Sequence, residues 1–279
     1  MATNTRSRES ANTTETDGWI QSMNFNLEYE MNHARRGMAL IFNQKSFDWK
    51  LKMKTRNGTD ADRDRLVSRF EELGFEVKAY NDYNRDKVLS EINKAAAADH
   101  LDADCFVCIF LSHGEDGHVY AEDEKIDIPE ITDLFKGDKC RSLVGKPKIF
   151  IWQACRGDKK DDPVTPMSVE DSDDEMDVDA GVLHTLPAGA DFIMCYSTAE
   201  GFCSFREPSN GSWYIQDLCE ILGLHHSELQ FTDILTLVNM KVSLRTVPNC
   251  GNSISGKKQM PCFASMLTKR LFFRRNPQT

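Results

Sequence analysis

The 279-residue sequence predicts an α/β fold with a mainly parallel sheet covered by helices. Short apolar runs alternate with segments of helical period at the spacing of strand–helix–strand units. The runs 105–111 and 148–152 are almost continuously apolar, as expected for strands that are buried on both faces. The chain is long enough for one large core or for two small domains, and its composition is ordinary for a globular protein.

In the first half of the chain, the predicted strands and helices follow one another in alternation. Thr59 or Asp60 can cap the first helix, and Gly74 can end it because glycine readily adopts the left-handed conformation. The second helix places its apolar residues at helical spacing on one face. The predicted elements are a strand at 36–43, a helix at 59–73, a strand at 75–80, a helix at 84–98, a strand at 105–111, a hairpin at 117–119, a helix at 128–135 and a strand at 148–152.

An acidic segment, residues 157–179, then interrupts the pattern. It is rich in Asp and Glu and nearly lacks apolar residues, so we expect an exposed, mobile loop within a single core. Residues 1–30 are polar and lack periodicity, so we expect them to be disordered. Beyond the acidic segment, the predicted elements are a strand at 191–196, a helix capped by Ser212 and reaching Leu222, a helix at 231–240, and strands at 260–267 and 271–273.

The charge and the cysteines argue against several classes of protein. A formal net charge of −10 disfavours nucleic acid as a partner. No apolar run is long enough to span a bilayer, and the amino-terminal residues include no hydrophobic signal segment, so we expect neither a membrane protein nor a secreted one. Nine cysteines without paired spacing favour reduced thiols and a cytoplasmic location. No motif in the sequence predicts a cofactor.

Two residues suited to nucleophilic catalysis follow the predicted strands 105–111 and 148–152. These residues are His113 and Cys155. Because neighbouring parallel strands end at the same edge of a sheet, where α/β proteins hold their ligands, we expect the imidazole and the thiol to lie side by side. A thiol with an adjacent base is what a cysteine hydrolase requires. Gly157 allows a tight turn behind the thiol, where backbone N–H groups can face a developing oxyanion.

Less specific interpretations remain open at this point. A free cysteine is most often a buried structural thiol, although the polar residues after Cys155 weaken that interpretation. Cys105 and Cys108 have the Cys-x-x-Cys spacing of a zinc site. They lie inside a predicted strand, where side chains three residues apart face opposite ways, and no companion pair exists. We therefore expect no metal site.

The motif Gln-Ala-Cys-Arg-Gly around Cys155 resembles the signature of the caspase family. The resemblance extends from about Met38 to Phe273. With a short head and no death-fold domain, the chain resembles an executioner caspase zymogen. Further segments similar to caspase segments occur in the same order, and they are Ser112–Gly114, Gly145–Lys148, Gly211–Gln216 and Lys257–Cys262.

The resemblance implies a caspase-like α/β fold with a six-stranded, mostly parallel sheet and helices on both faces. It also implies a cysteine endopeptidase that cuts proteins after aspartate, acts in apoptosis and is made as a zymogen. The expected parts are a disordered prodomain at 1–30, removed after Asp17, a large subunit at 31–177 ending in the cleavable acidic linker 157–179, and a small subunit at 180–279. The expected partners are protein substrates, a second copy in a homodimer of large and small subunit pairs, an upstream initiator caspase and inhibitor proteins, with neither nucleic acid nor membrane.

The resemblance further implies roles for individual residues. Cys155 is the expected nucleophile and His113 the proton carrier, with the N–H groups of Gly114 and Cys155 at the oxyanion and the backbone carbonyl of Lys54 as the third partner. A pair of guanidinium groups suits an aspartate socket, because each can grip a carboxylate by bidentate hydrogen bonds. The expected substrate-binding residues are Arg56, Gln153, Ser204, Phe205, Arg206 and Trp213. The expected processing sites are Asp17, Asp171, Asp177 and Asp179.

The residues that flank Arg206 depart from the executioner pattern. Phe205 and Glu207 stand where executioners usually carry Trp and Asn. Phe205 can still wall the pocket for the second residue before the cut (P2). Glu207 places an acid near the pocket for the fourth residue before the cut (P4), where it should repel aspartate. The P4 preference therefore stays open.

Two rival functions fit the residues less well. A non-catalytic decoy of active caspases typically loses the cysteine, the histidine or a socket arginine, and all of these are present. A related protease that cuts after Arg or Lys would need acidic residues in the socket, where the matching positions are basic.

Overall fold

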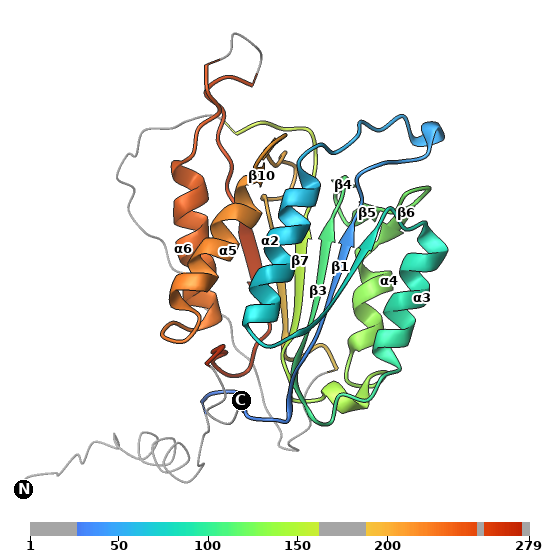
Figure 1. The fold of residues 1–279 in the computed structure, drawn as a ribbon, viewed down its shortest axis with the longest axis vertical. Coiled ribbons are helices and arrows are strands. Elements are labelled where there is room, and N and C mark those ends of the chain that lie inside the picture. Colours follow the sequence, from blue (N-terminus) through green and yellow to red (C-terminus); the bar gives the residue numbers. More distant parts are fainter. Residues whose placement is uncertain (1–26, 162–187, 250–253, 275–279) are drawn as a thin grey trace, which may run out of the picture.

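The computed structural model describes residues 27–161, 188–249 and 254–274, and its centre is a six-stranded sheet. The strands lie in the order β11–β8–β7–β3–β1–β2, and all neighbours are parallel except β11, which runs antiparallel to β8 (Figure 1). Their bounds are β1 (Arg35–Asn43), β2 (Glu76–Asn81), β3 (Ala103–Leu111), β7 (Lys148–Gln153), β8 (Phe192–Tyr196) and β11 (Cys262–Ser265). The predicted six-stranded, mostly parallel sheet is confirmed.

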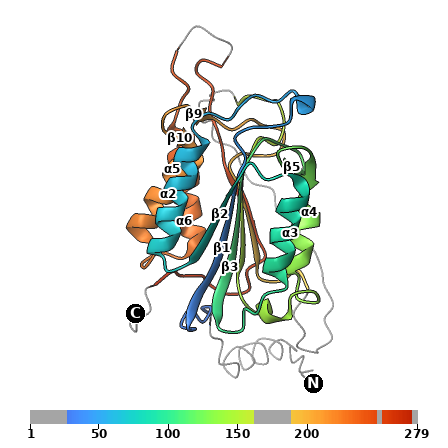
Figure 2. The same cartoon turned by 45° about the vertical axis from the view of Figure 1, so that its right-hand side comes forward.

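Helices cover both faces of this sheet (Figures 1 and 2). Two hydrophobic cores result, one on each face. Along β3, Cys105 and Val107 belong to one core, while Phe106 and Cys108 belong to the other. The unbroken apolar run at 105–111 thus reflects a strand buried on both faces. The helices on one face are α2 (Thr59–Glu72), α5 (Trp213–His225) and α6 (Phe231–Leu244), and those on the other are α3 (Arg85–Ala96) and α4 (Ile128–Thr132).

Two small antiparallel sheets lie near the carboxyl ends of the central strands (Figure 1). The predicted hairpin at 117–119 is confirmed within the first of them. The helix predicted at 128–135 is shorter, because α4 tightens into a 3-10 turn, as helix ends often do. The elements are β4 (Gly114–Glu115), β5 (His118–Tyr120), β6 (Lys125–Asp127), β9 (Arg206–Glu207), β10 (Gly211–Ser212), and the 3-10 turns η1 (Trp49–Leu51), η2 (Asp133–Phe135) and η3 (Arg141–Leu143).

The strand predicted at 271–273 is wrong. Leu271 and Phe273 are buried, but their backbone bonds to helix ends rather than to the sheet. The N–H of Phe231, at the start of α6, donates to the Leu271 carbonyl at 2.7 Å, and the Phe273 N–H donates to the carbonyl of His226 at 3.1 Å. The segment thus satisfies backbone groups that helix termini leave without partners. Its alternating apolar pattern indicated burial, not strand pairing.

Residues 27–30, which we expected in the disordered head, pack against the carboxyl-terminal segment. Tyr29 is 6% exposed, and its N–H donates to the Arg270 carbonyl at 3.0 Å. Its hydroxyl donates to the buried Asp191 carboxylate at 2.6 Å and accepts from the Thr268 N–H at 2.9 Å. Residues 1–26 and 162–187 lie outside the described residues, so the expected disorder of the head and of the acidic loop stays a prediction there.

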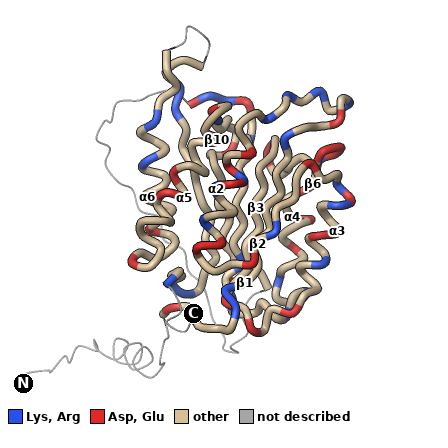
Figure 3. Tube along the Cα trace, viewed as in Figure 1, with Lys and Arg blue, Asp and Glu red and all other residues tan. Residues whose placement is uncertain are grey.

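Charged side chains of both signs are interspersed along the described elements (Figure 3). On α2, Arg63 pairs with Asp60 at 3.3 Å and with Asp64 at 2.7 Å. Such surface pairs contribute little stability, about 0.2–1 kcal/mol each. Within the described ranges, no helix is long and apolar enough to cross a membrane.

Replacing Tyr29 by Phe should lower the free energy of unfolding by about 1–3 kcal/mol, because Asp191 and the Thr268 N–H lose a buried partner. Denaturant unfolding followed by circular dichroism measures the change. The control is Leu27→Ala in the same segment, where the side chain is 57% exposed and the effect should stay within about 0.5 kcal/mol. Equal effects of the two substitutions would show that the Tyr29 contacts contribute no stability.

Candidate active site

Strands β3 and β7 are neighbours in the central sheet (Figure 1), and the two predicted catalytic residues follow their carboxyl ends. Leu111 and Gln153, the last residues of these strands, are partners in the parallel register. His113 and Cys155 each follow two residues after that pair. The ladder continues past the strand ends, since the Ser112 N–H donates to the Gln153 carbonyl at 3.1 Å. The register therefore places the imidazole and the thiol in neighbouring positions.

His113 is held by a backbone carbonyl and an aromatic ring. Its Nε2 forms a hydrogen bond of 2.8 Å with the Lys54 carbonyl, the contact expected from the family resemblance. The Phe47 ring lies against the imidazole, with the ring centres 5.0 Å apart. A bond to a carbonyl requires a proton on Nε2, so Nδ1 of the neutral ring is free to act as a base. Burial lowers the pKa of His113, which favours this neutral form.

The Cys155 sulfur is surrounded by donors from the segment after β8. The Ser204 N–H donates to it at 3.4 Å, and the Ser204 hydroxyl lies 3.9 Å from it. The Cys203 hydrogen bond, and after it the bonds from Ser204, lower the pKa of the Cys155 thiol against the opposing effect of burial. A thiolate held by such donors is the reactive form of a cysteine nucleophile.

Close backbone packing holds two glycines against the Cys155 turn. A Cβ on Gly114 would lie 2.8 Å from the Cys155 carbonyl oxygen, so only glycine fits there. Gly157, at φ 150°, packs against Gly201, where a Cβ would come within 2.5 Å of the carbonyl oxygen. The peptide groups of residues 114 and 155 are thus kept close together, as an oxyanion site needs.

Arg56 is buried, with 1% of its surface exposed. Its Nη1 donates to the Gln44 carbonyl at 2.9 Å and to Thr59 Oγ1 at 2.8 Å. Its Nε and Nη2 have no hydrogen-bond partner among the described residues. Burial, followed by the charge of Arg206, lowers the pKa of Arg56 to about 9, so the group is still a cation at neutral pH. A buried guanidinium with two unpaired donors is suited to bind a carboxylate.

Arg206 and Gln153 lie with Arg56 in this socket. Arg206 Nε donates to the Asn57 carbonyl at 2.9 Å, which joins the Arg206 loop to the loop of Arg56. Burial lowers the pKa of Arg206. Gln153 Nε2 donates to Ser204 Oγ at 3.1 Å, and within the described chain its Oε1 has no hydrogen-bond partner. Hydrogen bonds thus join Arg206 to the loop of Arg56, and they join Gln153 to Ser204, whose N–H donates to the Cys155 sulfur.

A buried carboxylate, that of Asp62, joins α2 to the start of α5. It accepts the Ser212 N–H at 2.8 Å and the Ser212 hydroxyl at 2.6 Å. Ser212 does occupy the predicted cap position of α5, but the predicted capping role of its side chain is wrong, because Asp62 takes the hydroxyl. Burial raises the pKa of Asp62 to about 6, against the effect of these bonds and of the charges of Arg56 and Arg206.

Phe205 and Trp213 form an aromatic wall next to Arg206, with their ring centres 5.1 Å apart. Glu207 contacts the outer side of this wall. Its carboxylate accepts Trp213 Nε1 at 3.0 Å and Asn210 Nδ2 at 2.9 Å, and Arg245 Nη1 lies 3.9 Å from Glu207 Oε1. The acid that we expected to repel aspartate at P4 is therefore hydrogen-bonded and lies near a cation.

The sequence comparisons agree with this geometry. A family model described as Caspase domain matches residues 36–272. The chain belongs to the caspase family. It is similar to Caspase-6 of Mus musculus, with 57% identity over 269 residues (93% of this chain and 98% of the relative). It is 43% identical to Caspase-7 of Gallus gallus over 247 residues (88% and 80%) and 41% identical to Caspase-3 of Felis catus over 246 residues (88% and 86%).

This caspase is a cysteine endopeptidase of the executioner type, which cuts proteins after aspartate and acts in apoptosis. Sequence reasoning missed three contributors to its site, namely Phe47 beneath His113, Asp62 beneath Ser212 and Cys203 beside Cys155. Their contacts join residues far apart in the chain, so no local motif marks them. The predicted processing residues Asp17, Asp171, Asp177 and Asp179 lie outside the described residues.

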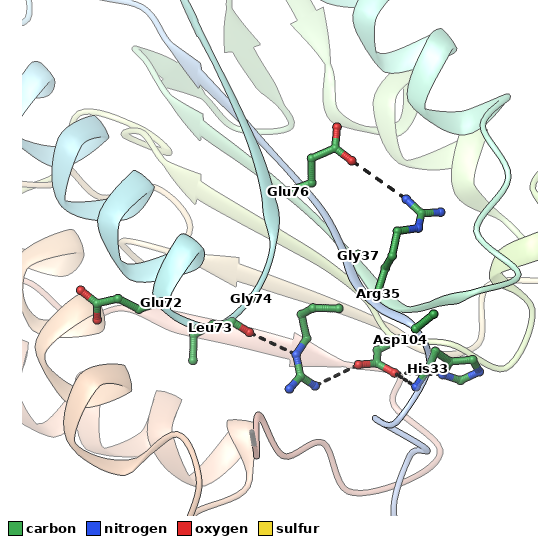
Figure 4. Close-up of a pocket in the computed structure, with 10 residues that line it drawn as sticks. His33, Arg35, Gly37, Glu72, Leu73, Gly74, Glu76 and Asp104 are labelled. Atoms are coloured by element: carbon green, nitrogen blue, oxygen red, sulfur yellow. Dashed lines mark hydrogen bonds and ion pairs between the residues drawn. The ribbon is translucent and has the colours of Figure 1, made fainter. Parts of the chain in front are cut away.

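A cavity at the opposite, amino-terminal edge of the sheet is separate from this site (Figure 4). Asp104 accepts Arg36 Nη1 at 3.0 Å and contacts His33 Nδ1 at 2.9 Å. Arg36 Nε also donates to the Leu73 carbonyl at 3.2 Å. Arg36 and Asp104 are buried, and the three side chains are bonded to one another, which indicates a structural role at the base of β1 and β3.

Alkylation of Cys155 by iodoacetamide should titrate below the pH expected for a free cysteine, whose pKa is about 8.5, because Cys203 and Ser204 donate to the thiolate. The rate of inactivation as a function of pH measures this. Replacing Cys203 by Val removes one donor and should move the midpoint to higher pH. Cys262→Ser, at another half-buried thiol, is the control and should leave the midpoint unchanged. An unchanged midpoint in Cys203→Val would contradict the assigned donor.

Proposed function

We propose that Cys155 is the nucleophile of this caspase and that His113 carries its protons. The observation that supports this most directly is the pairing of Leu111 with Gln153, which brings both side chains to one edge of the sheet. The lowered pKa of Cys155 and the bond between His113 and the Lys54 carbonyl support it further, because they favour a thiolate and an oriented base.

In the proposed reaction neutral His113 takes the thiol proton of Cys155 on Nδ1, and the thiolate attacks the scissile carbonyl carbon. The N–H groups of Gly114 and Cys155 hold the oxyanion. The C–N bond then breaks, and protonated His113 gives its proton to the leaving amine. Water next attacks the thioester, one of its protons passes to His113, and the thiolate leaves. The products are a peptide that ends in an aspartate carboxylate and a peptide with a free amino terminus.

The aspartate before the cut (P1) binds between Arg56 and Arg206, with Gln153 beside them. The two unpaired nitrogens of Arg56 support this assignment, since a carboxylate offers two acceptors in matching geometry. Ser204 contacts the substrate beside the nucleophile, and Phe205 and Trp213 wall the P2 pocket. Their ring contact gives that pocket an apolar side.

Activation by cleavage at internal aspartates divides the chain at Asp171, Asp177 or Asp179, into the large subunit at 31–177 and the small subunit at 180–279. The prodomain, residues 1–30, is released after Asp17. The strand pairing supports this division, because β7 and β8 lie on either side of the cut and remain neighbours from the Lys148–Phe192 pair to the Trp152–Tyr196 pair. Both subunits therefore belong to one core before and after cleavage.

The caspase family forms dimers of large and small subunit pairs and cuts protein substrates. For this chain the supporting feature is β11, the strand at one end of the sheet, which pairs with β8 alone among the described strands. An unpaired strand edge is a natural surface for a second copy. An initiator caspase, as the activating protease, and inhibitor proteins complete the proposed partners. The proposed location is the cytoplasm, in keeping with the free thiols of the described cysteines.

The decisive test of the nucleophile is Cys155→Ala. The variant should fold normally, as judged by circular dichroism and unfolding, and should lose both hydrolysis of an Asp-terminated fluorogenic peptide and self-processing in the expression host. Cys262→Ser is the matched control and should retain both. Hydrolysis above background in Cys155→Ala would remove this residue from the mechanism.

Replacing Arg56 or Arg206 by Lys should reduce kcat/KM for Asp substrates, because a point charge cannot reproduce the paired donors of a guanidinium. The expected loss of transition-state stabilisation is about 2–5 kcal/mol. Steady-state kinetics with a tetrapeptide substrate measure the loss. Arg35→Lys, at the exposed amino end of β1, serves as the control and should have no measurable effect. If both socket variants stay within a factor of about three of wild type, the P1 assignment is wrong.

Glu207 should weaken the preference for aspartate at P4 through its negative charge, although Trp213, Asn210 and Arg245 reduce that effect. Glu207→Gln keeps the acceptor for Trp213 and should raise the relative rate for Asp at P4 by about threefold, or about 0.7 kcal/mol. A positional scan of tetrapeptides measures this, and raised salt should diminish the difference. A strong Asp preference in wild type that is unchanged in the variant would contradict the role of Glu207.

A further inference from the structure

We propose that Cys155 and Cys203 form a reversible disulfide in the presence of hydrogen peroxide, with Cys203 acting as the resolving thiol. Cys155 lies just after β7 and Cys203 lies after β8. The proposal rests on the assignment of Cys155 as the nucleophile, since a reactive thiolate is the group that peroxide attacks first.

Backbone hydrogen bonds hold the two segments together before any oxidation. The Arg156 N–H donates to the Phe202 carbonyl at 3.0 Å. The Lys159 N–H donates to the Gly201 carbonyl at 3.0 Å, and the Cys203 N–H donates to the Lys159 carbonyl at 2.8 Å. The position of Cys203 relative to the turn after β7 is therefore fixed by the fold. The entropy that the chain loses when the two segments come together is lost on folding, not on forming the disulfide.

Contacts of Cys203 and of the next residue, Ser204, place the Cys203 side chain near the Cys155 turn. Cys203 Sγ lies 3.3 Å from the Gly157 carbonyl oxygen, so the side chain points toward the Cys155 turn. The adjacent Ser204 N–H lies 3.4 Å from Cys155 Sγ, which puts the Cys203 Cα within about 5.8 Å of that sulfur given standard bond lengths. Both residues are half-buried, so a small oxidant can reach them.

The chemistry balances with hydrogen peroxide as the oxidant. The Cys155 thiolate attacks one peroxide oxygen, the O–O bond breaks, and hydroxide leaves, giving a sulfenic acid. The Cys203 sulfur then attacks the Cys155 sulfur. The S–S bond forms, the S–O bond breaks, and the departing hydroxide takes the Cys203 proton to give water. Each sulfur loses one electron overall, and the peroxide gains two and becomes one water and one hydroxide, which takes a proton from the solvent.

Electrostatics set the order of these two steps. The hydrogen bond to Cys155, then burial, then the Cys155 charge raise the pKa of Cys203, so Cys203 is a protonated thiol beside a thiolate. Peroxide therefore reacts first at Cys155. The sulfenic acid is neutral, so it no longer holds Cys203 protonated, and the second thiol ionises more readily once its target has formed.

Two consequences follow for the enzyme. The disulfide blocks the nucleophile and protects it from further oxidation to a sulfinic acid, which thiols do not reduce. Because Cys155 precedes the linker and Cys203 follows it, the bond also joins the large subunit to the small one in the processed enzyme. A dithiol reductant would restore both the free nucleophile and separable subunits.

The test treats the processed enzyme with hydrogen peroxide, blocks free thiols, and separates the chains on a denaturing gel without reductant. A band containing both subunits should form and should disappear with dithiothreitol. In a tryptic digest, residues 149–156, in which Cys155 is the sole cysteine, should be found bound to the peptide that carries Cys203. The same digest of the uncut chain detects the bond whether or not the linker is cleaved.

The variant Cys203→Ser keeps a hydroxyl donor but cannot form the bond. It should give no joined band. After long exposure to peroxide, dithiothreitol restores some fraction of each enzyme's starting activity, and that fraction should be about threefold smaller in the variant than in wild type. Cys262→Ser is the matched control and should behave as wild type. A joined band that persists in Cys203→Ser, or equal recovery in the two enzymes, overturns the proposal. Either result leaves the assignment of the nucleophile intact, since Cys155→Ala tests that separately.

Discussion

The parallel register between β3 and β7 is the constraint on which the rest of this active site depends. It sets Leu111 opposite Gln153, and the two catalytic candidates follow at equal distances along their strands. A shift by one residue would turn every side chain of β3 to the wrong core. The cores resist that shift, because Phe110 stacks on Trp152 with ring centres 5.3 Å apart, a contact between the two strands. Packing on both faces of the sheet thus determines the chemistry at its edge.

The second requirement is electrostatic, because two guanidinium groups must lie close together with little solvent. The lowered pKa values of Arg56 and Arg206 reflect what burial does to such a pair. The fold offsets part of this repulsion with the negative charge of Asp62, whose carboxylate is bonded to Ser212 and so does not enter the socket. The Nε and Nη2 donors of Arg56 have no hydrogen-bond partner among the described residues.

The active site draws on segments from both sides of the acidic linker. Cys155 and His113 come from strands that precede the linker, whereas Ser204 and Arg206 come from the segment after β8. A zymogen of this design can keep its core intact while cleavage alters how the two sets of loops meet. The same arrangement places Cys203, from the segment after the linker, near the proposed nucleophile Cys155, from the segment before it. The disulfide that we propose would therefore join the two subunits.

The amino-acid sequence by itself determined the α/β class, the order of the elements and the two strand ends that carry His113 and Cys155, because apolar periodicity depends on residues that are near in the chain. It also identified the arginines of the socket through the caspase motifs. Only the tertiary structure decided that the backbone of 271–273 bonds to helix ends, that the Ser212 hydroxyl donates to Asp62, and that Glu207 accepts a hydrogen bond from Trp213. Each of these depends on which partner a polar group meets after folding. That partner comes from a distant segment that local patterns do not reveal.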